Sequence, residues 1–512
     1  MKRMLPYVKQ PAARTQQQLV AFRGLNWSDQ AQEGELREGT NLSARRFPCL
    51  AVRRGRAKQT AYAGCTALTA RGKLVAVKGT QLLYDGKAVG TVTEGEKQFA
   101  VVNTKMVIWP DKVYLDLNSN TVKPLGAKIS GTGGTFTAEK LTVSGWGDLT
   151  KQFKAGDAVT ISGCTAQTKN NKDIILKAVT ATELTVAKNT LAEGAETGTL
   201  TLERRVPDLD FICESENRLW GCSSEKQTIY ASSLGDPTNF YVYAGLSTDS
   251  YALAVGTEGE FTGCCKQTSS VLFWKETKLH KLLGGYPAEY SLYTYDMEGL
   301  RKGCHKSLAV INEVLYYMGL HGVYAYSGGV PTLISAGFGE KDFSDGVAGT
   351  DGSRYFLSVK EGGAAHLLAY ETDKNLWLRE DGTRAVDFAR LGRELYFLDG
   401  TGDVWRMDSG QEDENLTWSA QLVPFYASIQ GRKYFSQIVM RLELPRGAWM
   451  KAEVRYDGGP WRETGKIVGR AADSIPVRLP VNRCDRLDLR LSGKGPCVVR
   501  AMLLEYGMGS ER

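Results

Sequence analysis

The stretch AVDFARLGRELYFLDGTGDVWRMD, residues 385–408, contains three short apolar runs that are separated by tight polar turns. Aromatic and aliphatic residues fill the runs, and such residues pack well on a pleated surface. Glycine and aspartate mark the turns, where they favour chain reversal. The stretch therefore predicts three consecutive antiparallel strands.

The same arrangement recurs along the chain. From about residue 210 onward several units begin roughly 45 to 50 residues apart, which is near the length of a four-stranded propeller blade. A blade cannot bury both faces alone, so blades pack against one another in a radial array. The units are found at 73–91, 98–117, 210–233, 261–285, 307–329, 353–377 and 385–408.

Long helical periodicity is missing, so we predict an all-β chain with a β-propeller of about six or seven blades over 46–126 and 205–414. An array of β-sandwiches is the competing prediction. In the first hairpin unit, KLVAVKGTQLLYDGKAVGT (73–91), the pair Asp85-Gly86 predicts a two-residue turn.

Three regions depart from this rhythm. Residues 127–204 predict a small β-barrel inserted into the propeller, because turn residues separate short runs such as VTISG, IILKAVT and GTLTL. Residues 415–512 alternate apolar and polar side chains with period two, which predicts a C-terminal β-sandwich. Residues 1–45 show no sustained period, and we expect an extended arm that lies across its own domain or a neighbour, or a disordered tail.

The chain has 512 residues with a formal net charge of +7, and its basic residues concentrate near the ends. The run RRFPCLAVRRGRAK (45–58) is the densest group. It makes five arginines candidates for contact with a partner or with phosphate, whereas a solvated surface is the ordinary alternative. These candidates are Arg45, Arg46, Arg53, Arg54 and Arg56.

Motifs for catalysis and for cofactors are missing. The ten cysteines include no C-x-x-C, and there are only four histidines, so we expect no metal site and no cofactor. G-x-S-x-G and H-E-x-x-H do not occur, and no nucleic-acid-binding module is recognisable. In SLGDPTNF (233–240), Asp236 precedes a proline, which favours turn formation over a catalytic carboxylate. We therefore expect no catalytic residues and no enzymatic activity.

Apolar segments of the sequence bear on its expected targeting. The start MKRMLPYVKQ is followed by no apolar segment, so we expect no secretory signal. Eighteen apolar residues in a row do not occur, so we expect no membrane span.

Several phrases resemble a known family. Four stretches are similar to structural proteins of tailed phages: WSDQ and NLSARRFPCLAVRRGR within residues 27–56, the segment 206–240, STDSYALAVGTEGEFTGCC (247–265) and GVYAYSGGVPTLIS (322–335). They resemble packaged-DNA stabilisation or tail-hub proteins, whose propeller subunits form a nozzle below the portal.

The resemblance implies a homohexameric ring around a DNA channel, located in the virion tail and synthesised in the bacterial cytoplasm. It also implies contacts with portal or adaptor proteins, with other tail proteins and, without sequence preference, with phage DNA. A phage adhesin or carbohydrate-binding tail component is the main alternative. A propeller that hydrolyses glycans is the third.

Overall fold

The computed structural model of the chain describes residues 15–427, 431–480 and 482–508. Within these residues the chain forms β-strands and short 3-10 turns, and it contains no α-helix. The 3-10 turns are η1 Ala44–Arg46, η2 Thr60–Tyr62, η3 Leu149–Lys151, η4 Thr168–Asn170, η5 Pro287–Glu289, η6 His305–Ser307 and η7 Ala336–Phe338.

The chain divides into two compact units. Unit 1 comprises Met1–Thr60, Gly322–Tyr324 and Thr332–Arg512, and unit 2 comprises Ala61–His321 and Ala325–Pro331.

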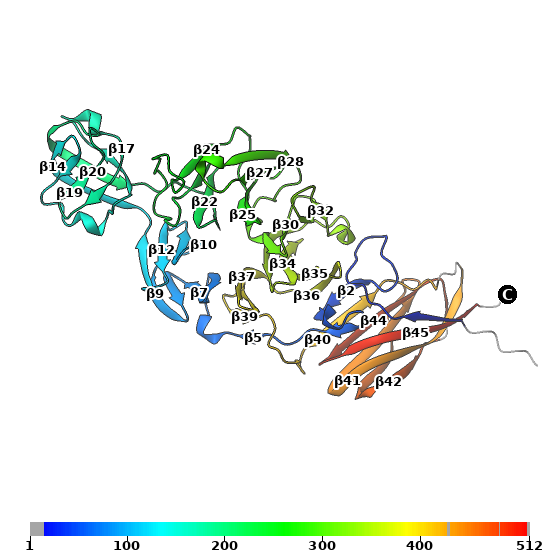
Figure 1. Ribbon diagram of the computed structural model, residues 1–512. Coiled ribbons are helices and arrows are strands. Elements are labelled where there is room, and N and C mark those ends of the chain that lie inside the picture. The colour runs from blue at the N-terminus through cyan, green and yellow to red at the C-terminus, as the bar shows by residue number, and fades with distance from the viewer. Residues whose placement is uncertain (1–14, 428–430, 481, 509–512) are drawn as a thin grey trace, which may run out of the picture. The chain divides into compact units, whose positions relative to one another are not determined.

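Seven four-stranded antiparallel sheets form the blades of a β-propeller (Figure 1). This confirms the predicted fold class, and the part of the chain that the structure describes contains seven such sheets. Their strands are β6 Ala67–Arg71, β7 Lys73–Lys78, β8 Gln81–Tyr84 and β9 Lys87–Thr91; β10 Gln98–Val102, β11 Lys105–Trp109, β12 Val113–Asp116 and β13 Thr121–Pro124; β21 Phe211–Ser215, β22 Arg218–Ser223, β23 Thr228–Ala231 and β24 Tyr251–Ala254; β25 Gly263–Gln267, β26 Ser270–Trp274, β27 Lys278–Leu283 and β28 Ser291–Asp296; β29 Ala309–Ile311, β30 Val314–Met318, β31 Val323–Tyr326 and β32 Thr332–Leu333; β33 Ser344–Thr350, β34 Arg354–Glu361, β35 Ala364–Glu371 and β36 Leu376–Asp381; and β37 Ala385–Leu391, β38 Glu394–Asp399, β39 Val404–Arg406 and β5 Ala57–Lys58.

Neighbouring blades of unit 2 bury their faces against each other. Trp220 and Cys222 of β22 share one apolar cluster with Val271 and Phe273 of β26 in the next blade. All five side chains of β26 are buried, as expected for a strand covered on both faces. The hairpin between β8 and β9 contains Asp85 and Gly86 at φ 54° and 75°, the positive values that a type I′ turn requires.

The blade formed from residues 385–408 takes its fourth strand from the beginning of the chain. Strand β5 pairs with β39 in the register Trp405↔Lys58 and Arg406↔Ala57. Just beyond β5, the amide of Gln59 donates to the carbonyl of Val404 at 2.8 Å. The last blade of unit 1 is therefore complete only when the N-terminal segment is in place.

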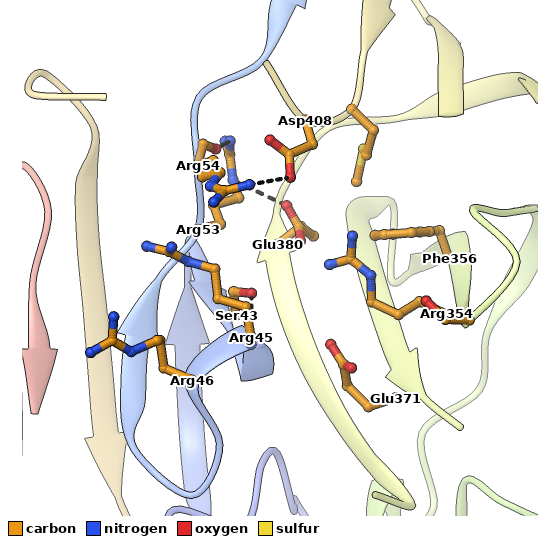
Figure 2. Close-up of a pocket in the computed structure, with 12 residues that line it drawn as sticks. Ser43, Arg45, Arg46, Arg53, Arg54, Arg354, Phe356, Glu371, Glu380 and Asp408 are labelled. Atoms are coloured by element: carbon orange, nitrogen blue, oxygen red, sulfur yellow. Dashed lines mark hydrogen bonds and ion pairs between the residues drawn. The ribbon is translucent and has the colours of Figure 1, made fainter. Parts of the chain in front are cut away.

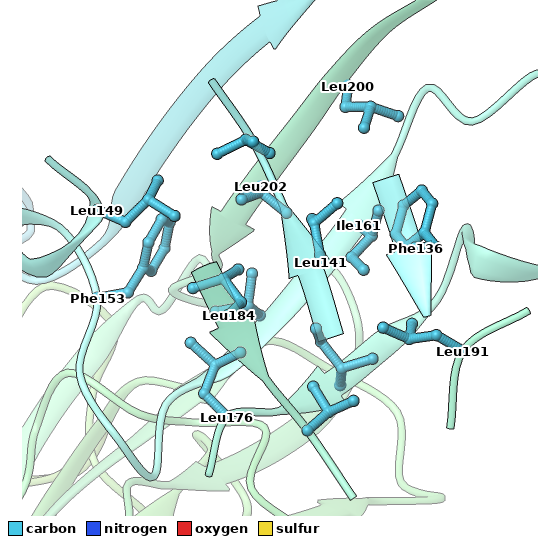
Figure 3. Packing of buried hydrophobic residues seen from close by; sticks show 14 of the residues in the cluster. Phe136, Leu141, Leu149, Phe153, Ile161, Leu176, Leu184, Leu191, Leu200 and Leu202 are labelled. Atoms are coloured by element: carbon cyan, nitrogen blue, oxygen red, sulfur yellow. The ribbon is translucent and has the colours of Figure 1, made fainter. Parts of the chain in front are cut away.

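The inserted domain is a seven-stranded sheet in the order β17-β16-β20-β14-β15-β19-β18. Side chains from all seven strands contribute to one apolar core, which includes Phe136, Leu141, Ile161 and Leu200 (Figure 3). Because every strand faces this core, the domain can fold around it as a small barrel-like body. Its strands are β14 Ala127–Thr137, β15 Lys140–Thr142, β16 Ala158–Ser162, β17 Asp173–Ile175, β18 Ala178–Val179, β19 Glu183–Thr185 and β20 Gly194–Arg204.

A ten-stranded sheet in unit 1 combines the two ends of the chain. The 24-residue strand β41 pairs with β45 along Lys433–Glu443 and with β44 along Trp449–Tyr456, and its register shifts between these parts. The sheet therefore forms the two halves of a sandwich. Its strands are β1 Thr15–Leu19, β2 Leu36–Thr40, β3 Leu42–Ser43, β4 Leu50–Val52, β40 Thr417–Leu422, β41 Lys433–Tyr456, β42 Arg462–Arg478, β43 Arg483–Cys484, β44 Leu487–Lys494 and β45 Val498–Met508.

The segment expected to be an extended arm, residues 1–45, contributes strands to this sandwich. Strand β1 pairs with Met502–Tyr506 of β45, and β2 pairs with β40. From residue 15 onward the segment thus lies on its own chain, while residues 1–14 fall outside the described part. A continuous period is missing from this part of the sequence because its strands are short and separated by loops.

Candidate functional site

The arginine-rich run 45–58 lies in unit 1, where it connects the sandwich to the propeller blades β33–β36 and β37–β39. It begins in η1, continues through β4 and ends in β5. Asn41, which precedes the run at φ 61°, binds it from the side, because its side-chain oxygen accepts a hydrogen bond from Arg53 Nε at 2.8 Å. The run is therefore part of the core of unit 1 as well as its surface.

Arg53 and Arg56 are buried in a shared ion-pair cluster with Glu380 and Asp381 at the end of β36. Arg53 Nε lies 3.1 Å from Glu380 Oε2, and Arg56 Nη1 lies 2.8 Å from Asp381 Oδ2. The two arginine side chains are only 10% and 9% exposed. Burial, together with the neighbouring charge of Arg56, lowers the pKa of Arg53, although both carboxylates oppose that shift. These two candidates bind the N-terminal segment to the blade.

The other three candidates are more exposed and are also paired with carboxylates. Arg45 lies 2.6 Å from Glu412, Arg46 lies 3.1 Å from Glu443, and Arg54 lies 3.6 Å from Asp408. Their side chains are 26%, 46% and 41% exposed, respectively. Of the five, Arg46 and Arg54 are the most accessible to a partner.

A pocket of about 370 Å³ opens beside these arginines, entirely within unit 1 (Figure 2). One wall comes from the N-terminal segment, another from blade β33–β36, and a third from the residues after β39. The lining residues are Ser43, Arg45, Arg46, Arg53, Arg54, Ser353, Arg354, Phe356, Glu371, Glu380, Met407 and Asp408.

Arg354 and Glu371 were not identified from the sequence. They face each other across β34 and β35, in the register Arg354↔Glu371. Arg354 Nε donates to Asp351 Oδ2 at 2.8 Å, and the guanidinium lies 4.8 Å from the centre of the Phe356 ring. Burial of the guanidinium lowers the pKa of Arg354, but the nearby carboxylates raise it overall, and Asp351 has the largest effect among them. Burial also raises the pKa of Glu371.

Asp236, in the SLGDPTNF stretch, is at a turn and also at an ion-pair cluster in unit 2. Its carboxylate lies 3.1 Å from Lys105 of β11 and 2.6 Å from Lys154 of the inserted domain. Asn239 donates to Asp236 at 2.9 Å and to Asp157 of the inserted domain at 3.0 Å. The turn therefore joins the inserted domain to blade β21–β24.

A second cavity, of about 580 Å³, lies in unit 2 beside the strands β10, β21 and β25. Cys213, Cys264 and Cys265 contribute to its wall. Contact with Cys264 and burial raise the pKa of Cys213, and burial raises the pKa of the other two. These groups are therefore neutral thiols at neutral pH, a form with low nucleophilicity.

In the part of the chain that the structure describes, no cluster of three or more histidine, cysteine, aspartate or glutamate side chains has an arrangement suited to a metal ion. The same residues include no helix of the length and hydropathy needed to cross a membrane.

Comparison with known proteins gives structural likeness only. No protein-family model matches the chain, and no curated protein matches it. An exo-β-1,3-galactanase from Phanerochaete chrysosporium is similar at 9% identity and a TM-score of 0.23, over 56% of this chain and 92% of the galactanase. Hsv2 from Kluyveromyces lactis is similar at 12% identity and a TM-score of 0.28, over 43% of this chain and 62% of that protein. An acylaminoacyl peptidase is similar at 9% identity and a TM-score of 0.31, over 72% of this chain and 59% of the peptidase.

The prediction that the chain has no enzymatic activity was wrong, because the sequence gives no ground to exclude catalysis. Two of these similar structures, the galactanase and the peptidase, are enzymes. An all-β fold without a familiar catalytic motif therefore does not argue against catalysis, because activity depends on individual sites and not on the fold.

Proposed function

We propose that this protein is a structural component of a tailed-phage virion, a tail-hub or nozzle subunit that assembles into a homohexameric ring below the portal. The phrases at 27–56, 206–240 and 322–335 support this proposal, together with the combination of propeller and sandwich. In such a ring the protein retains and conducts the DNA, and it contacts portal or adaptor proteins and other tail proteins.

The observation that carries the proposal is the free edge of strand β42. Among the described residues this 17-residue strand pairs with β41 alone, so its other edge has no strand beside it. An unpaired edge readily accepts a strand from another chain. Pro476 lacks an amide donor, and it therefore weakens the C-terminal half of this edge. Residues 462–468 are left as the best place for a neighbouring subunit.

Val468 allows a direct test of this edge. Its side chain is 63% exposed on β42, and its neighbour Lys466 covers the Trp449 ring. A lysine at position 468 should discourage edge pairing, because charged side chains on an edge resist the approach of another strand. Val330→Lys in unit 2 is the matched control, since Val330 is 88% exposed and lies far along the chain from β42.

The experiment is negative-stain microscopy and native mass spectrometry of the purified protein and of virions. We expect six-fold rings for the wild type and for Val330→Lys, and a loss of rings for Val468→Lys with the fold retained. A wild-type protein that stays monomeric, and virions without a six-fold ring on the tail axis, would disprove the ring.

Exposed tyrosines in unit 2 favour a second candidate, a carbohydrate-binding tail component. Tyr293 and Tyr295 alternate along β28 and are 48% and 42% exposed, and nearby Tyr286 is 38% exposed. Aromatic rings on a surface can pack against the apolar face of a sugar. Binding on a glycan array that Tyr293→Ser and Tyr295→Ser abolish would support this candidate, and an array without signal would exclude it.

A further inference from the structure

Two arginines that line the pocket of unit 1 retain hydrogen-bond donors. Arg354 uses Nε for Asp351, and within the described residues its two terminal amino groups donate to nothing else. Arg54 approaches Asp408 only to 3.6 Å, which is beyond hydrogen-bond distance. Figure 2 shows the Arg354 guanidinium pointing from β34 toward the side of the pocket where Glu380 and the N-terminal segment lie.

The same pocket holds an acceptor that is poorly satisfied. Glu371 is 6% exposed, and one of its oxygens accepts a long hydrogen bond from Lys374 at 3.4 Å. The neighbouring cations Arg354 and Lys374 do not offset the cost of burying the charged carboxylate, and burial therefore raises the pKa of Glu371. Hydroxyl groups of a ligand would supply the missing donors.

We propose that this pocket binds a small sugar that carries an oxyanion, either a phosphate or a carboxylate group. The guanidinium groups of Arg354 and Arg54 bind the oxyanion, because a planar fork of N–H donors matches two oxygens of such a group. Glu371 accepts from the sugar hydroxyls. A volume of about 370 Å³ is within the range of small-molecule sites.

The lining also favours an anion over a cation. Five arginines face three carboxylates in the wall of the pocket. Glu380 is already engaged by Arg53 and Arg56, so it repels a bound anion less than a free carboxylate would. The site lies within one unit of one chain, and it does not depend on the ring proposed above.

The test is isothermal calorimetry on the full chain with glucose 6-phosphate, glucuronic acid, glucose and inorganic phosphate. We expect at least one of the two acidic sugars to bind and glucose to bind at least ~tenfold more weakly, since the oxyanion contacts are lost. Tighter binding of glucose 6-phosphate identifies phosphate as the preferred group, and tighter binding of glucuronic acid identifies carboxylate.

Substitutions assign the binding to this pocket. Arg354→Gln should weaken the binding of the acidic sugar by ~tenfold or more. Arg54→Gln should also weaken it and carries less risk to folding, because Arg54 is 41% exposed. Arg441→Gln, an exposed arginine on β41, is the matched control and should bind as the wild type does.

Glu371→Gln tests the contact with the sugar. It should reduce the preference for glucose 6-phosphate over inorganic phosphate, because a carboxylate accepts hydroxyl hydrogen bonds more strongly than an amide does. The proposal is overturned if neither acidic sugar binds, or if Arg54→Gln and Arg354→Gln both bind as tightly as the wild type. Equal affinity for inorganic phosphate and glucose 6-phosphate in the wild type overturns the sugar contact.

Discussion

Asp236 connects two parts of unit 2 through charge. Its carboxylate contacts Lys105 of the propeller and Lys154 of the inserted domain, and its side chain is 19% exposed. Burial alone would raise the pKa of Asp236, but the hydrogen bond from Lys154 and the charge of Lys105 lower it overall. The carboxylate is therefore ionised at neutral pH.

Asp236→Asn should destabilise unit 2 by about 1–2 kcal/mol, because Lys105, which is 22% exposed, loses its counter-charge, whereas Lys154 is 53% exposed and stays hydrated. The measurement is urea unfolding at pH 7, combined with limited proteolysis at the junctions near residues 127 and 204. Glu193→Gln, an exposed carboxylate of the inserted domain, is the control and should change little. An Asp236→Asn protein as stable as the control would refute the joining role.

Glu196 is a carboxylate whose hydrogen bonds predict a response of the inserted domain to acid. Its carboxylate accepts hydrogen bonds from the amides of Thr165, Ala166 and Gln167, and from the Thr165 hydroxyl. These bonds, with that from Gln167 the strongest, lower the pKa of Glu196 to about 2. A lowered pKa in the folded state stabilises the fold above the unfolded pKa, and this gain is lost as pH falls toward the folded value.

We therefore expect amide hydrogen exchange in residues 163–168 to accelerate as the pH falls from about 4.5 to about 2, after correction for the intrinsic exchange rate. In Glu196→Gln, whose side chain carries no charge, protection should be lower at neutral pH and nearly independent of pH. Wild-type protection that stays constant over this interval would contradict the prediction.

Arg53 and Arg46 differ in burial, and this separates two roles for the arginine-rich run. Arg53→Gln should cost about 3 kcal/mol, because Glu380 loses a partner in a site that is 10% exposed or less. Arg46→Gln should cost about 0.5 kcal/mol or less, as exposed pairs usually do. Denaturant midpoints of the two variants measure the difference, and equal midpoints would show that the run is a surface feature only.

At the scale of the elements, strand β5 completes a blade by pairing with β39, which lies far from it in the sequence. Gln59→Pro removes the amide that donates to the carbonyl of Val404. We expect a loss of about 1–2 kcal/mol and faster hydrogen exchange in β39, whereas Gln59→Ala keeps the amide and should leave β39 protected. Unchanged exchange in Gln59→Pro would mean that β5 contributes little to the blade.

Local patterns in the sequence predict the elements better than they predict their partners. The hairpin at Asp85-Gly86, the all-β fold and the propeller follow from turn residues and from the repeated strands, because these signals lie within a few residues of each other. The pairing of β5 with β39 does not follow, because it joins residues about 350 positions apart. Arg354 and Glu371 meet only through the register of two strands, so their pocket could not be foreseen.

At the scale of the whole molecule, the two compact units should respond differently to removal of the N-terminal segment. Residues 15–58 supply strands to the sandwich and to blade β37–β39, all of them in unit 1. A chain that begins at Ala61 should lose protection in β33–β45 and keep it in the blades from β6 to β28. Hydrogen exchange by mass spectrometry would show this, and uniform loss of protection would mean that the units fold as one.

The ten-stranded sheet combines strands that lie far apart in the sequence, and this affects the order in which parts of the chain can fold during synthesis. Strand β1 pairs with β45, and β4 pairs with both β3 and β45, so this part of the sheet cannot be completed until the residues up to Tyr506 have been translated. Blades of unit 2 can form meanwhile, since a domain can fold once its residues have emerged. A chain that is truncated before β45 would therefore leave β1 unpaired and one edge of β4 open, and proteases could cleave these exposed segments.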